Sequence, residues 1–405
     1  MSRIDELIRE LCPEGVPSRS LGEVCVIQAG SSINKDRIAS SPGSYPVVNS
    51  GREPLGYFAQ YNVEDDPIGI ASRGSVGLVT WNTGRFFRGN LNYSCTPKDP
   101  LNLNPRFLYH ALLSLRDEIQ ALCTHDGIPA LNASNLRKLK LWVPPESAQE
   151  EIVRILDTFT ELEAELEAEL EARTSQYEET RNRLMDFDAV EDHPLTGLIR
   201  EFCPDGVAVA PIGDLAEVRA GATPSKSVPE YWTGGTIPWL NSGEVNKGSV
   251  RKADNYISQA GYDSCSTTLI PPGSVIVALA GQGKTRGMVG RTRLTCCTNQ
   301  SLASLVPQGV LDGDFLYFYL KTQYARLREI SSGDGTRGGL NLEMLRLYRI
   351  PLPPIPVQFE IVRILDAFDS LVTDLSAGLP AEIAARRKQY EYYSDKLLSF
   401  EKLAT

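Results

Sequence analysis

The sequence predicts a mixed α+β protein: two globular α/β-type domains in tandem repeat, joined by two long antiparallel coiled-coil helices with pseudo-two-fold symmetry. The string EIVRILD occurs twice, at residues 151–157 and 360–366, and each copy follows a Pro-Pro pair and opens a helical stretch. Other segments repeat in the same order: LIRELCPEGV (7–16) matches LIREFCPDGV (198–207), and FLY (107–109) matches FLY (315–317). One module is therefore written twice, and such a protein usually needs two surfaces of the same kind.

Length and repeat together predict the order of the segments. At roughly 100 to 200 residues per domain, a chain of 405 residues has room for two to four domains with their own cores. We expect a short N-terminal helix at 1–15, a globular domain at 16–145, a central coiled-coil helix at 146–190, a second globular domain with a leading short helix at 191–354, and a C-terminal coiled-coil helix at 355–405.

Within each globular domain, strand and helix patterns follow one another in the same order. SYPVVNS (44–50), PIGIAS (67–72) and VGLVTW (76–81) alternate with turn clusters, which is typical of strands. FLYHALLSLRDEIQAL (107–122) then changes to helical periodicity. The second domain repeats this order through TIPWLNSG (236–243), SVIVALAG (274–281) and FLYFYLKTQYARLREI (315–330).

The segments after the Pro-Pro pairs carry apolar residues at alternating three- and four-residue spacing, which predicts coiled-coil helices. The first helix contains Leu162, Leu166 and Leu170 in the tetrapeptide run LEAELEAELEAR at 162–173. One tetrapeptide more or less would move the helix end by about 6 Å and turn it by about 40° beyond a full turn, so the repeat number can set a distance. An inert solvated helix face is the alternative. The second helix has Gly378 and Pro380 in its middle, which predicts a break.

The net charge of −10 is concentrated in one segment. Residues 146–192 hold 16 acidic and 4 basic side chains, which leaves 35 acidic and 37 basic side chains for the rest of the chain. The globular domains are therefore free to meet phosphates despite the acidic total.

Composition also bounds the compartment and the covalent chemistry. No apolar run approaches the ~18 residues that span a bilayer, and the N-terminus lacks the apolar core of a signal peptide, so we expect a cytoplasmic protein. The eight cysteines show no CxxC spacing, which predicts buried free thiols rather than disulfides or a zinc site. We expect no metal and no cofactor in this chain.

Motifs for catalysis are missing from the sequence. GQGKT (281–285) lacks the earlier glycine that a P-loop requires, since Ala278 stands there. Only three histidines are present, and the chain carries no methyltransferase motif, helicase motif or nuclease carboxylate cluster. The stretch GKTRGMVGRTR (283–293) instead predicts a flexible basic loop suited to DNA, with a solvated hairpin loop as the alternative.

Several motifs together resemble one family, the specificity subunits of type I restriction-modification systems. They are the duplicated hinge helix with EIVRILD, the closing EIAARRKQYEYYSDKLLSF (382–400), the CPxGV openings, and the run from AGATPSK through YWTGGTIPWLNSGE at 220–244. The match covers nearly the full length. The first domain departs from it, with AGSSINK in place of AGATPSK and no YWxGG.

The resemblance implies a non-catalytic DNA reader. Residues 16–145 and 191–354 would be target recognition domains, each reading one half of a bipartite double-stranded DNA target. The helices would hold the domains apart across an unread spacer and dock two methyltransferase subunits, and restriction subunits would join to form the endonuclease. S-adenosylmethionine, ATP and Mg²⁺ would be used by these partners, and no membrane would be involved.

Candidate DNA contacts are basic or amide side chains in predicted turns. The first domain offers Lys35, Arg37, Arg52, Arg73, Arg85, Arg88, Asn90 and Asn92, and the second offers Lys226, Asn241, Lys247, Lys284, Arg286, Arg291, Arg293 and Arg337. For each of them, phosphate contact or plain solvation outweighs base reading, since most protein–DNA hydrogen bonds go to the backbone. Asn49 and Asn241 both sit in NSG turns, which favours a structural role. Trp232 and Trp239 are expected to pack within the fold.

Two other classes of protein stay open at this point. One is a coiled-coil scaffold whose globular domains bind protein or glycan, and the other is an enzyme with nuclease or methylase chemistry of its own. Co-purification with methyltransferase subunits and a sequence-dependent DNA shift would separate a DNA reader from the scaffold. Incubation of the isolated chain with DNA and cofactors would test for the enzyme.

Overall fold

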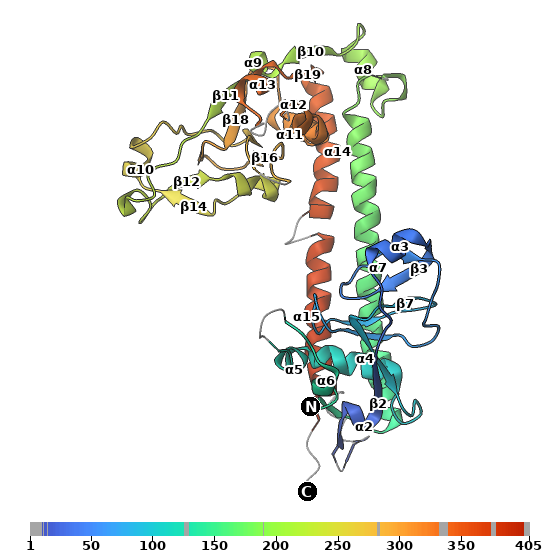
Figure 1. Ribbon diagram of the computed structural model, residues 1–405. Helices are drawn as coiled ribbons and strands as arrows, with labels where there is room; N and C mark the ends of the chain where they lie inside the picture. The colour runs from blue at the N-terminus through green and yellow to red at the C-terminus, as the bar shows by residue number, and fades with distance from the viewer. Residues whose placement is uncertain are drawn as a thin grey trace. The chain divides into compact units, whose positions relative to one another are not determined.

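The computed structural model describes residues 10, 12–13, 15–124, 129–188, 190–281, 284–331, 339–373 and 378–400. The chain forms two compact units: unit 1 comprises Met1–Ala168 and Ala381–Thr405, and unit 2 comprises Glu169–Pro380. Each unit combines one globular domain with parts of the long helices (Figure 1). The division between the units falls inside the two segments predicted as coiled-coil helices, after Ala168 and after Pro380.

Unit 1 contains the first globular domain, which is built on two small sheets and a two-stranded ribbon. The larger sheet has the order β2–β8–β5–β6, and all its pairs are antiparallel. The smaller sheet has the order β4–β3–β7, and its β3–β7 pair is parallel. The strands are β1 (Ser18–Ser20), β2 (Cys25–Ala29), β3 (Pro42–Val48), β4 (Tyr57–Phe58), β5 (Ile68–Ala71), β6 (Val79–Trp81), β7 (Phe87–Arg88), β8 (Asn92–Pro97) and β9 (Lys140–Trp142). The short helices are α2 (Leu21–Val24), α3 (Lys35–Ser40), α4 (Pro105–Ser114), α5 (Arg116–Ala121) and α6 (Ala133–Leu136).

Unit 2 contains the second globular domain, with sheets in the orders β11–β18–β15–β16–β13 and β14–β12–β17 and a β10–β19 ribbon. The strands are β10 (Ala208–Pro211), β11 (Ala216–Ala220), β12 (Ile237–Leu240), β13 (Ser249–Val250), β14 (Asn255–Ile257), β15 (Val275–Ala278), β16 (Val289–Thr292), β17 (Cys297–Thr298), β18 (Leu302–Pro307) and β19 (Arg349–Leu352). The short helices are α8 (Thr196–Phe202), α9 (Ile212–Leu215), α10 (Gln259–Asp263), α11 (Gly313–Thr322), α12 (Tyr324–Ile330) and α13 (Leu342–Leu347). The 3-10 helices are η1 (Val190–Asp192), η2 (Pro229–Tyr231) and η3 (Ser242–Lys247).

The two domains repeat one topology strand for strand. β2, β8, β5 and β6 of unit 1 correspond to β11, β18, β15 and β16 of unit 2, while β13 is an addition. The parallel pair is also repeated, with Val47 beside Phe87 in unit 1 and Trp239 beside Cys297 in unit 2. The predicted tandem repeat of mixed domains is therefore confirmed.

The predicted helices at 107–122 and 315–330 are each divided in two. α4 ends before Leu115 and α11 ends before Gln323, and a second helix starts directly after each of these residues. The backbone ψ angles of Leu115 and Gln323 are 23° and 6°, outside the α region, so the helical hydrogen bonding is interrupted there. The same interruption in both copies shows that the duplication preserved this bend.

A buried glutamine fastens each domain to the start of its long helix. The Gln149 side chain accepts a hydrogen bond from the Asn104 backbone N–H at 2.9 Å and donates to two backbone carbonyls. The Gln358 side chain accepts from the Asp312 N–H at 2.8 Å and also donates to two carbonyls. Both side chains are fully buried, and each satisfies backbone groups that would otherwise lack partners away from water.

The long helices are α7 (Glu146–Leu184), α14 (Ile355–Thr373) and α15 (Leu379–Leu398). In unit 1, α7 packs on α15: Phe159 stacks on Tyr393 with ring centroids 5.0 Å apart, and Glu163 pairs with Arg387. Residue numbers rise along one helix as they fall along the other, so this pair is antiparallel. In unit 2, α7 packs on α14, where the Tyr177 hydroxyl donates to Asp369 at 3.0 Å.

The predicted break near Pro380 is confirmed at Gly378, which is a bend and not part of a helix. α15 begins directly after it at Leu379, so Pro380 is the second residue of that helix. Proline is well accepted in the first turn, because backbone N–H groups there have no partner within the helix. The tetrapeptide run lies in the middle of α7, where Leu166 and Leu170 are half-buried and Leu162 is 37% exposed.

Three further observations concern the cysteines, possible metal sites and possible membrane-spanning helices. All eight cysteines are free thiols, and burial raises the pKa of Cys296 to about 12 and of Cys297 to about 11. Among the described residues, no three His, Cys, Asp or Glu side chains gather as a metal site would require. In the same part of the chain, no helix has both the length and the apolar composition needed to cross a membrane.

A set of polar side chains in unit 1, which we term the unit 1 charge cluster, ties α4 to the long helices. It consists of Arg106, His110, Asp157 and Tyr390. The Asp157 carboxylate accepts from Arg106 Nε at 2.7 Å and lies 2.7 Å from His110 Nε2, while His110 Nδ1 is 2.9 Å from the Tyr390 hydroxyl. His110 is fully buried. Burial lowers the pKa of its imidazole, although the hydrogen bond to Asp157 opposes this shift.

The corresponding set in unit 2, the unit 2 charge cluster, consists of Arg291, Asp314, Lys321, Asp366 and Asp369. The Arg291 guanidinium lies 2.7 Å from Asp366, 3.1 Å from Asp314 and 3.5 Å from Asp369. Burial opposes its charge, but these carboxylates raise the pKa of Arg291 above its ordinary value. The Lys321 ammonium is 3.4 Å from Asp369, and burial lowers the pKa of Lys321.

Candidate nucleic-acid interface

Most of the candidate side chains in the first domain lie on its surface. Lys35, Arg37, Arg52, Arg73, Arg85 and Asn90 are exposed. Two of these arginines are positioned by aromatic rings. The Arg37 guanidinium lies 5.5 Å from the ring centroid of Phe58, and that of Arg85 lies 4.8 Å from Tyr61. Such stacking reduces the conformational freedom of both side chains. Arg85 also pairs with the exposed Glu64.

The expectation that Arg88 and Asn92 lie in exposed turns is wrong. Arg88 ends β7 and Asn92 begins β8, and both are buried. The Arg88 guanidinium donates to Asn92 Oδ1 at 2.7 Å, to the Ile68 carbonyl at 3.0 Å and to Asp66. Its two terminal NH₂ groups donate within the fold and Asp66 balances its charge, so we leave Arg88 and Asn92 out of the proposed DNA surface.

The candidates of the second domain divide into exposed and engaged groups. Lys226 and Lys284 are exposed, whereas Arg286 and Arg293 are half-buried. Lys247 lies 2.6 Å from the buried Glu244 and 2.7 Å from Asp254, so its charge is largely balanced. Arg337 lies outside the described residues.

The predicted basic loop at 283–293 is partly a strand. Residues 289–292 form β16, which pairs with β15 in an antiparallel hairpin, and only the turn before it matches the prediction. Arg291 is buried within β16 and belongs to the unit 2 charge cluster, so its predicted place in an exposed loop is wrong. Arg293 pairs with Asp314 at 2.9 Å. The sequence did not predict this strand, because Val289 is its only large apolar side chain and glycine and basic residues alternate around it.

Asn49 and Asn241 both have structural roles, as the shared NSG turn suggested. Asn49 is buried, and its carbonyl oxygen accepts from the Leu91 N–H at 2.9 Å. A Cβ at Gly89 would lie 2.5 Å from that oxygen, so only glycine fits opposite Asn49. Asn241 caps η3, and its oxygen accepts from the Gly243 N–H at 2.8 Å.

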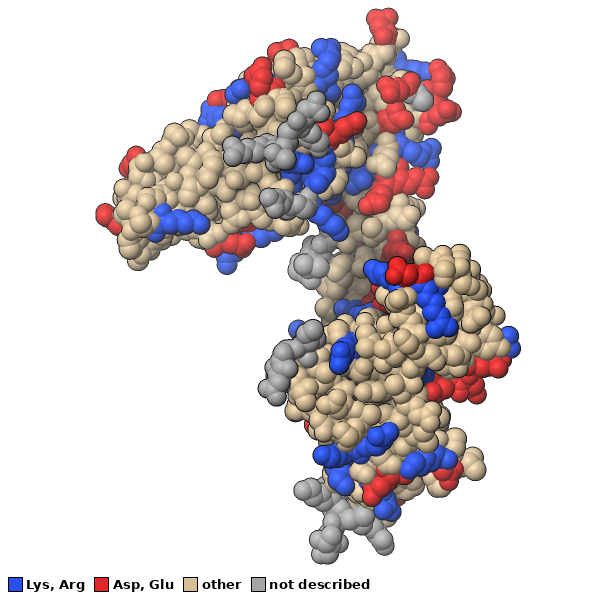
Figure 2. Space-filling model, in the orientation of Figure 1, with Lys and Arg blue, Asp and Glu red and all other residues tan. Residues whose placement is uncertain are grey.

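Lys and Arg side chains on the face shown in Figure 2 stand singly or in small groups over each globular domain, among uncharged surface. Such scattered cations suit contacts with phosphates spaced along a backbone rather than one compact anion. Acidic side chains gather along α7, where the sequence concentrates them.

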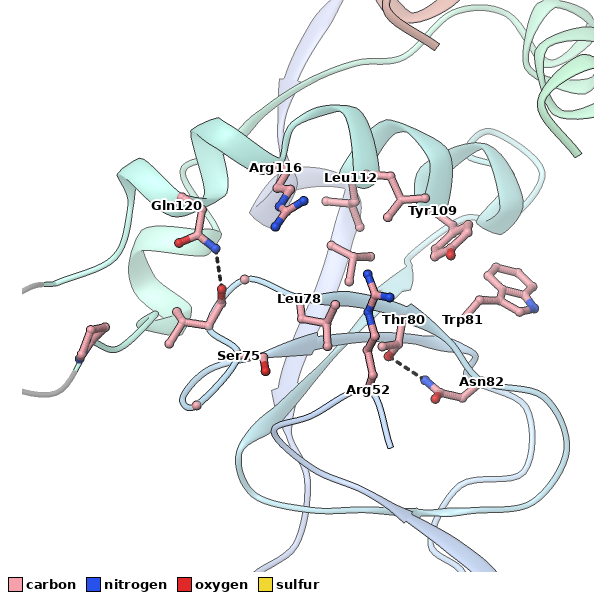
Figure 3. A pocket seen from close by; sticks show the side chains of 16 residues that line it. Arg52, Ser75, Leu78, Thr80, Trp81, Asn82, Tyr109, Leu112, Arg116 and Gln120 are labelled. Atoms are coloured by element: carbon pink, nitrogen blue, oxygen red, sulfur yellow. Dashed lines mark hydrogen bonds between the residues drawn. The ribbon is translucent and has the colours of Figure 1, made fainter. Parts of the chain in front are cut away.

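The first domain contains a cavity of about 990 Å³ between β6 and the helices α4 and α5. Figure 3 shows Arg52 and Arg116 directed into it from opposite walls, with Trp81 and Tyr109 at one end. The Gln120 side chain closes the other end by donating to the Val76 carbonyl at 2.5 Å. Cations and aromatic faces line this cavity together, a combination that favours flat or anionic groups.

A counterpart cavity of about 720 Å³ lies at the corresponding place in the second domain. Val289, Arg291 and Tyr317 line it where Val79 and Trp81 with Tyr109 line the first. Its lining also includes Asp366 and Asp369, so it contains carboxylates that the first cavity lacks.

The second domain has another cavity, of about 620 Å³, which sequence reasoning did not predict. We term it the amide cavity, and its main side chains are Trp232, Trp239, Asn241, Asn255, Asn299 and Gln300. The two indole rings meet edge to face with centroids 5.1 Å apart. Asn255 and the adjacent pair Asn299 and Gln300 were missed because they lie far apart in the sequence from each other and from Asn241, and only the strand register brings them together.

Comparison with protein families finds one matching model, described as the type I restriction modification DNA specificity domain. It matches twice, at residues 13–172 and 204–385. The two matches cover most of the chain and follow the two copies of the repeat.

Known proteins of the same kind are similar to this chain. The type I restriction enzyme EcoR124I/EcoR124II specificity subunit of Escherichia coli is 32% identical over 281 residues, which span 67% of this chain and 66% of that subunit. The crystal structure of the S subunit of a type I restriction-modification system from M. genitalium covers 95% of this chain and 96% of its own, with a TM-score of 0.64 and 19% identity. A structure concerned with complex assembly and conformational transition of the type I R-M system covers 96% and 98%, with a TM-score of 0.54 and 19% identity.

Proposed function

We propose that this chain, which belongs to the family of type I restriction-modification specificity subunits, selects the DNA sequence at which a multisubunit complex acts. The observation that carries the proposal is the duplicated fold: one strand topology occurs twice, with different side chains exposed on each copy. Two similar domains with different surfaces suit a bipartite target, in which each domain reads one half-site.

The DNA surface that we propose uses the exposed candidates of each domain. These are Lys35, Arg37, Arg52, Arg73, Arg85 and Asn90 in the first domain and Lys226 and Lys284 in the second. Most of them would contact phosphates and fix the register of the protein on the duplex, while amide and aromatic groups would read bases.

The chemistry is proposed to reside in partner subunits rather than in this chain. Two methyltransferase subunits would dock on the helices and use S-adenosylmethionine, and restriction subunits would add ATP- and Mg²⁺-dependent cleavage. Support comes from the E. coli relative, which is named as a specificity subunit of a restriction enzyme. We place the assembled complex in the cytoplasm, where both DNA and these small molecules are present.

We further propose that α7 sets the length of the unread spacer between the half-sites. The tetrapeptide run lies in the middle of this helix, and the division between the compact units falls inside it, after Ala168. Each tetrapeptide adds about 6 Å of helix, close to the rise of one or two base pairs. The pseudo-two-fold relation predicted for the two repeats would then match the symmetry of the DNA strands.

Methylome sequencing tests the proposal. The chain is expressed with its methyltransferase subunits in a host that lacks other DNA methylases, and methylated bases are mapped. We expect one motif with two defined half-sites and an unread spacer, and we expect it to vanish when this chain is omitted. Methylation at one contiguous motif, or at the same sites without this chain, would contradict the proposal and favour a scaffold.

A further inference from the structure

We propose that the amide cavity of unit 2 reads base edges of one half-site, with Asn255 as the side chain that recognises an adenine. The inference rests on the proposed function and adds a substrate feature to it. The motif run at 220–244 supplies only part of this site, and Asn255, Asn299 and Gln300 come from elsewhere in the chain.

The strand register explains how these residues meet. β12 and β17 run parallel, with Leu240 beside Thr298, so the residues that follow them, Asn241 and Asn299, leave the sheet at the same edge. β14 runs antiparallel to β12 and places Asn255 beside Trp239. One sheet edge therefore presents three asparagines in front of an indole ring.

Internal hydrogen bonds fix the orientation of most of these side chains. The Asn241 oxygen accepts from the Gly243 N–H at 2.8 Å, and the Asn299 oxygen accepts from the Ser301 N–H at 3.1 Å. The Gln300 oxygen accepts from the Thr223 hydroxyl. Since backbone N–H groups can only donate, they identify the oxygen end of each asparagine amide and leave its NH₂ group as the end that can donate to a ligand.

Both indole N–H groups are also engaged inside the fold. Trp232 Nε1 donates to the Ser225 carbonyl at 3.1 Å and Trp239 Nε1 to the Ala222 carbonyl at 3.0 Å. The rings thus offer apolar surface and no free donor to the cavity. They form a rigid wall, because each ring is held at its polar edge.

Asn255 differs from the other amides of the cavity. Within the described part of the chain, the structure shows no hydrogen-bond partner for either end of its side chain, which is half-buried. A free asparagine amide can donate to N7 and accept from N6 of adenine in the major groove, the pairing that distinguishes adenine from the other bases. Asn241, Asn299 and Gln300 offer donors, which suit acceptor atoms of the neighbouring base pairs.

The first domain lacks two of these four amides at the corresponding positions, while Asn90 stands where Gln300 does. The shared strand register matches Asn255 with Gly56 and Asn299 with Gly89, because Gly56 and Gly89 stand next to β4 and β7 as those residues stand at β14 and β17. Asn49, which corresponds to Asn241, is buried. The first domain would consequently read its half-site in another way, and a substitution in the amide cavity should affect one half-site alone.

The test compares methylomes of cells that express the full chain, its methyltransferase subunits and one of four forms: wild type, Asn255→Ala, Asn255→Asp or Gln308→Ala. An ionised Asp has the shape of Asn but cannot donate a hydrogen bond. A changed base preference in Asn255→Asp therefore cannot be attributed to misfolding. Gln308→Ala removes an exposed amide of the same unit that does not line the cavity.

We expect the wild-type motif to contain an adenine in one half-site whose discrimination falls about tenfold to hundredfold in Asn255→Ala. In Asn255→Asp, preference at that position should move toward cytosine, whose N4 amino group donates to a carboxylate. The other half-site, the spacer and the Gln308→Ala motif should not change. The inference would be overturned if both Asn255 variants kept the wild-type base discrimination at every position. In that case the bipartite motif, and with it the proposed function, would still stand. Loss of a bipartite motif in the wild type would instead refute the proposed function.

Discussion

In each unit, an aspartate of the long helix pairs with an arginine of the globular domain. The two aspartates are equivalent in the repeat, but the arginine comes from a different element in each unit. Asp157 and Asp366 are both the last residue of the EIVRILD string. In unit 1 the cation is Arg106 of α4, which stacks over Trp81 of β6 at 4.7 Å from the ring centroid. In unit 2, β16 supplies Arg291 at the position of Trp81, and α11 supplies Asp314 at the position of Arg106.

This difference shows what the duplicated motif determines. The motif fixes the position at which an aspartate contacts the globular domain. It does not fix the source of the arginine that pairs with this aspartate, which lies on a helix in unit 1 and on a strand in unit 2. The clusters also differ in redundancy: Arg291 faces three carboxylates, whereas the described residues give Arg106 and His110 the single carboxylate of Asp157. Unit 1 should therefore depend on its aspartate, and unit 2 on its arginine.

Removal of the cation from unit 2 should have the largest effect. Arg291→Met removes the buried cation that Asp314, Asp366 and Asp369 share, and breaking such a buried ion pair costs about 3–5 kcal/mol of unfolding free energy. Urea denaturation of the full chain measures the loss, and hydrogen exchange assigns it to unit 2. Arg363→Ala, which removes a surface pair with Glu360, is the control and should cost about 1 kcal/mol or less. Equal losses in the two variants would contradict the comparison.

The same substitution at the duplicated aspartates should then have unequal effects. Asp157→Asn removes the charge that Arg106 and the buried His110 share, and we expect a loss of about 1–3 kcal/mol. Asp366→Asn leaves Arg291 with Asp314 and Asp369, so its loss should stay below about 1 kcal/mol. Urea denaturation of both variants decides the matter, and a larger loss for Asp366→Asn would reverse the interpretation.

A pH profile separates the two clusters, because unit 2 has Phe318 where unit 1 has His110. Burial lowers the pKa of folded His110, so the unfolded state binds more protons once the pH falls below its ordinary value of about 6.5. Stability of unit 1 should accordingly be complete above that pH and fall below it, by up to about 1.4 kcal/mol per pH unit. His110→Gln should flatten this fall.

The control for that profile is His193→Gln in unit 2. Burial also lowers the pKa of His193, which lies 3.1 Å from the Leu184 carbonyl. Its replacement should change the acid sensitivity of unit 2 alone, as read from hydrogen exchange at pH 5 and pH 7. An unchanged profile for unit 1 in His110→Gln would show that its acid sensitivity has another source.

The smallest effect should come from the surface of the helix pair in unit 1. Arg387 pairs with Glu163 and Glu167 and is 52% exposed, so Arg387→Ala should cost about 1 kcal/mol or less. The loss should shrink further at high salt, which screens exposed charges. A salt-independent loss above about 2 kcal/mol would indicate that this pair is far less hydrated than its exposure suggests.

Much of the fold could be predicted from the sequence, because the repeat, the strand alternation and the helical seam are local patterns. β3, β5 and β6 lie where alternating apolar segments indicated strands, and α15 begins beside Pro380 as predicted. The bends at Leu115 and Gln323 could not be read, since both stand within continuous helical periodicity.

The candidate site was less predictable, because exposure depends on strand pairing rather than on residue type. Arg88 and Arg291 look like surface cations in glycine-rich stretches, yet strand pairing buries both among partners distant in the sequence. Asn255 carried no signal in the sequence, and only the strand register places it beside Trp239 at the amide cavity. Local sequence patterns do not indicate which distant strands pair with each other.

The central claim is that each unit reads one half-site and that α7 sets the distance between them. Deletion of residues 166–169 removes one tetrapeptide and about 6 Å of helix, and methylome sequencing of cells that express this variant with its methyltransferase subunits tests the claim most directly. We predict that both half-sites keep their sequences while the unread spacer changes length. Methylation of the same half-sites at an unchanged spacer would contradict the account.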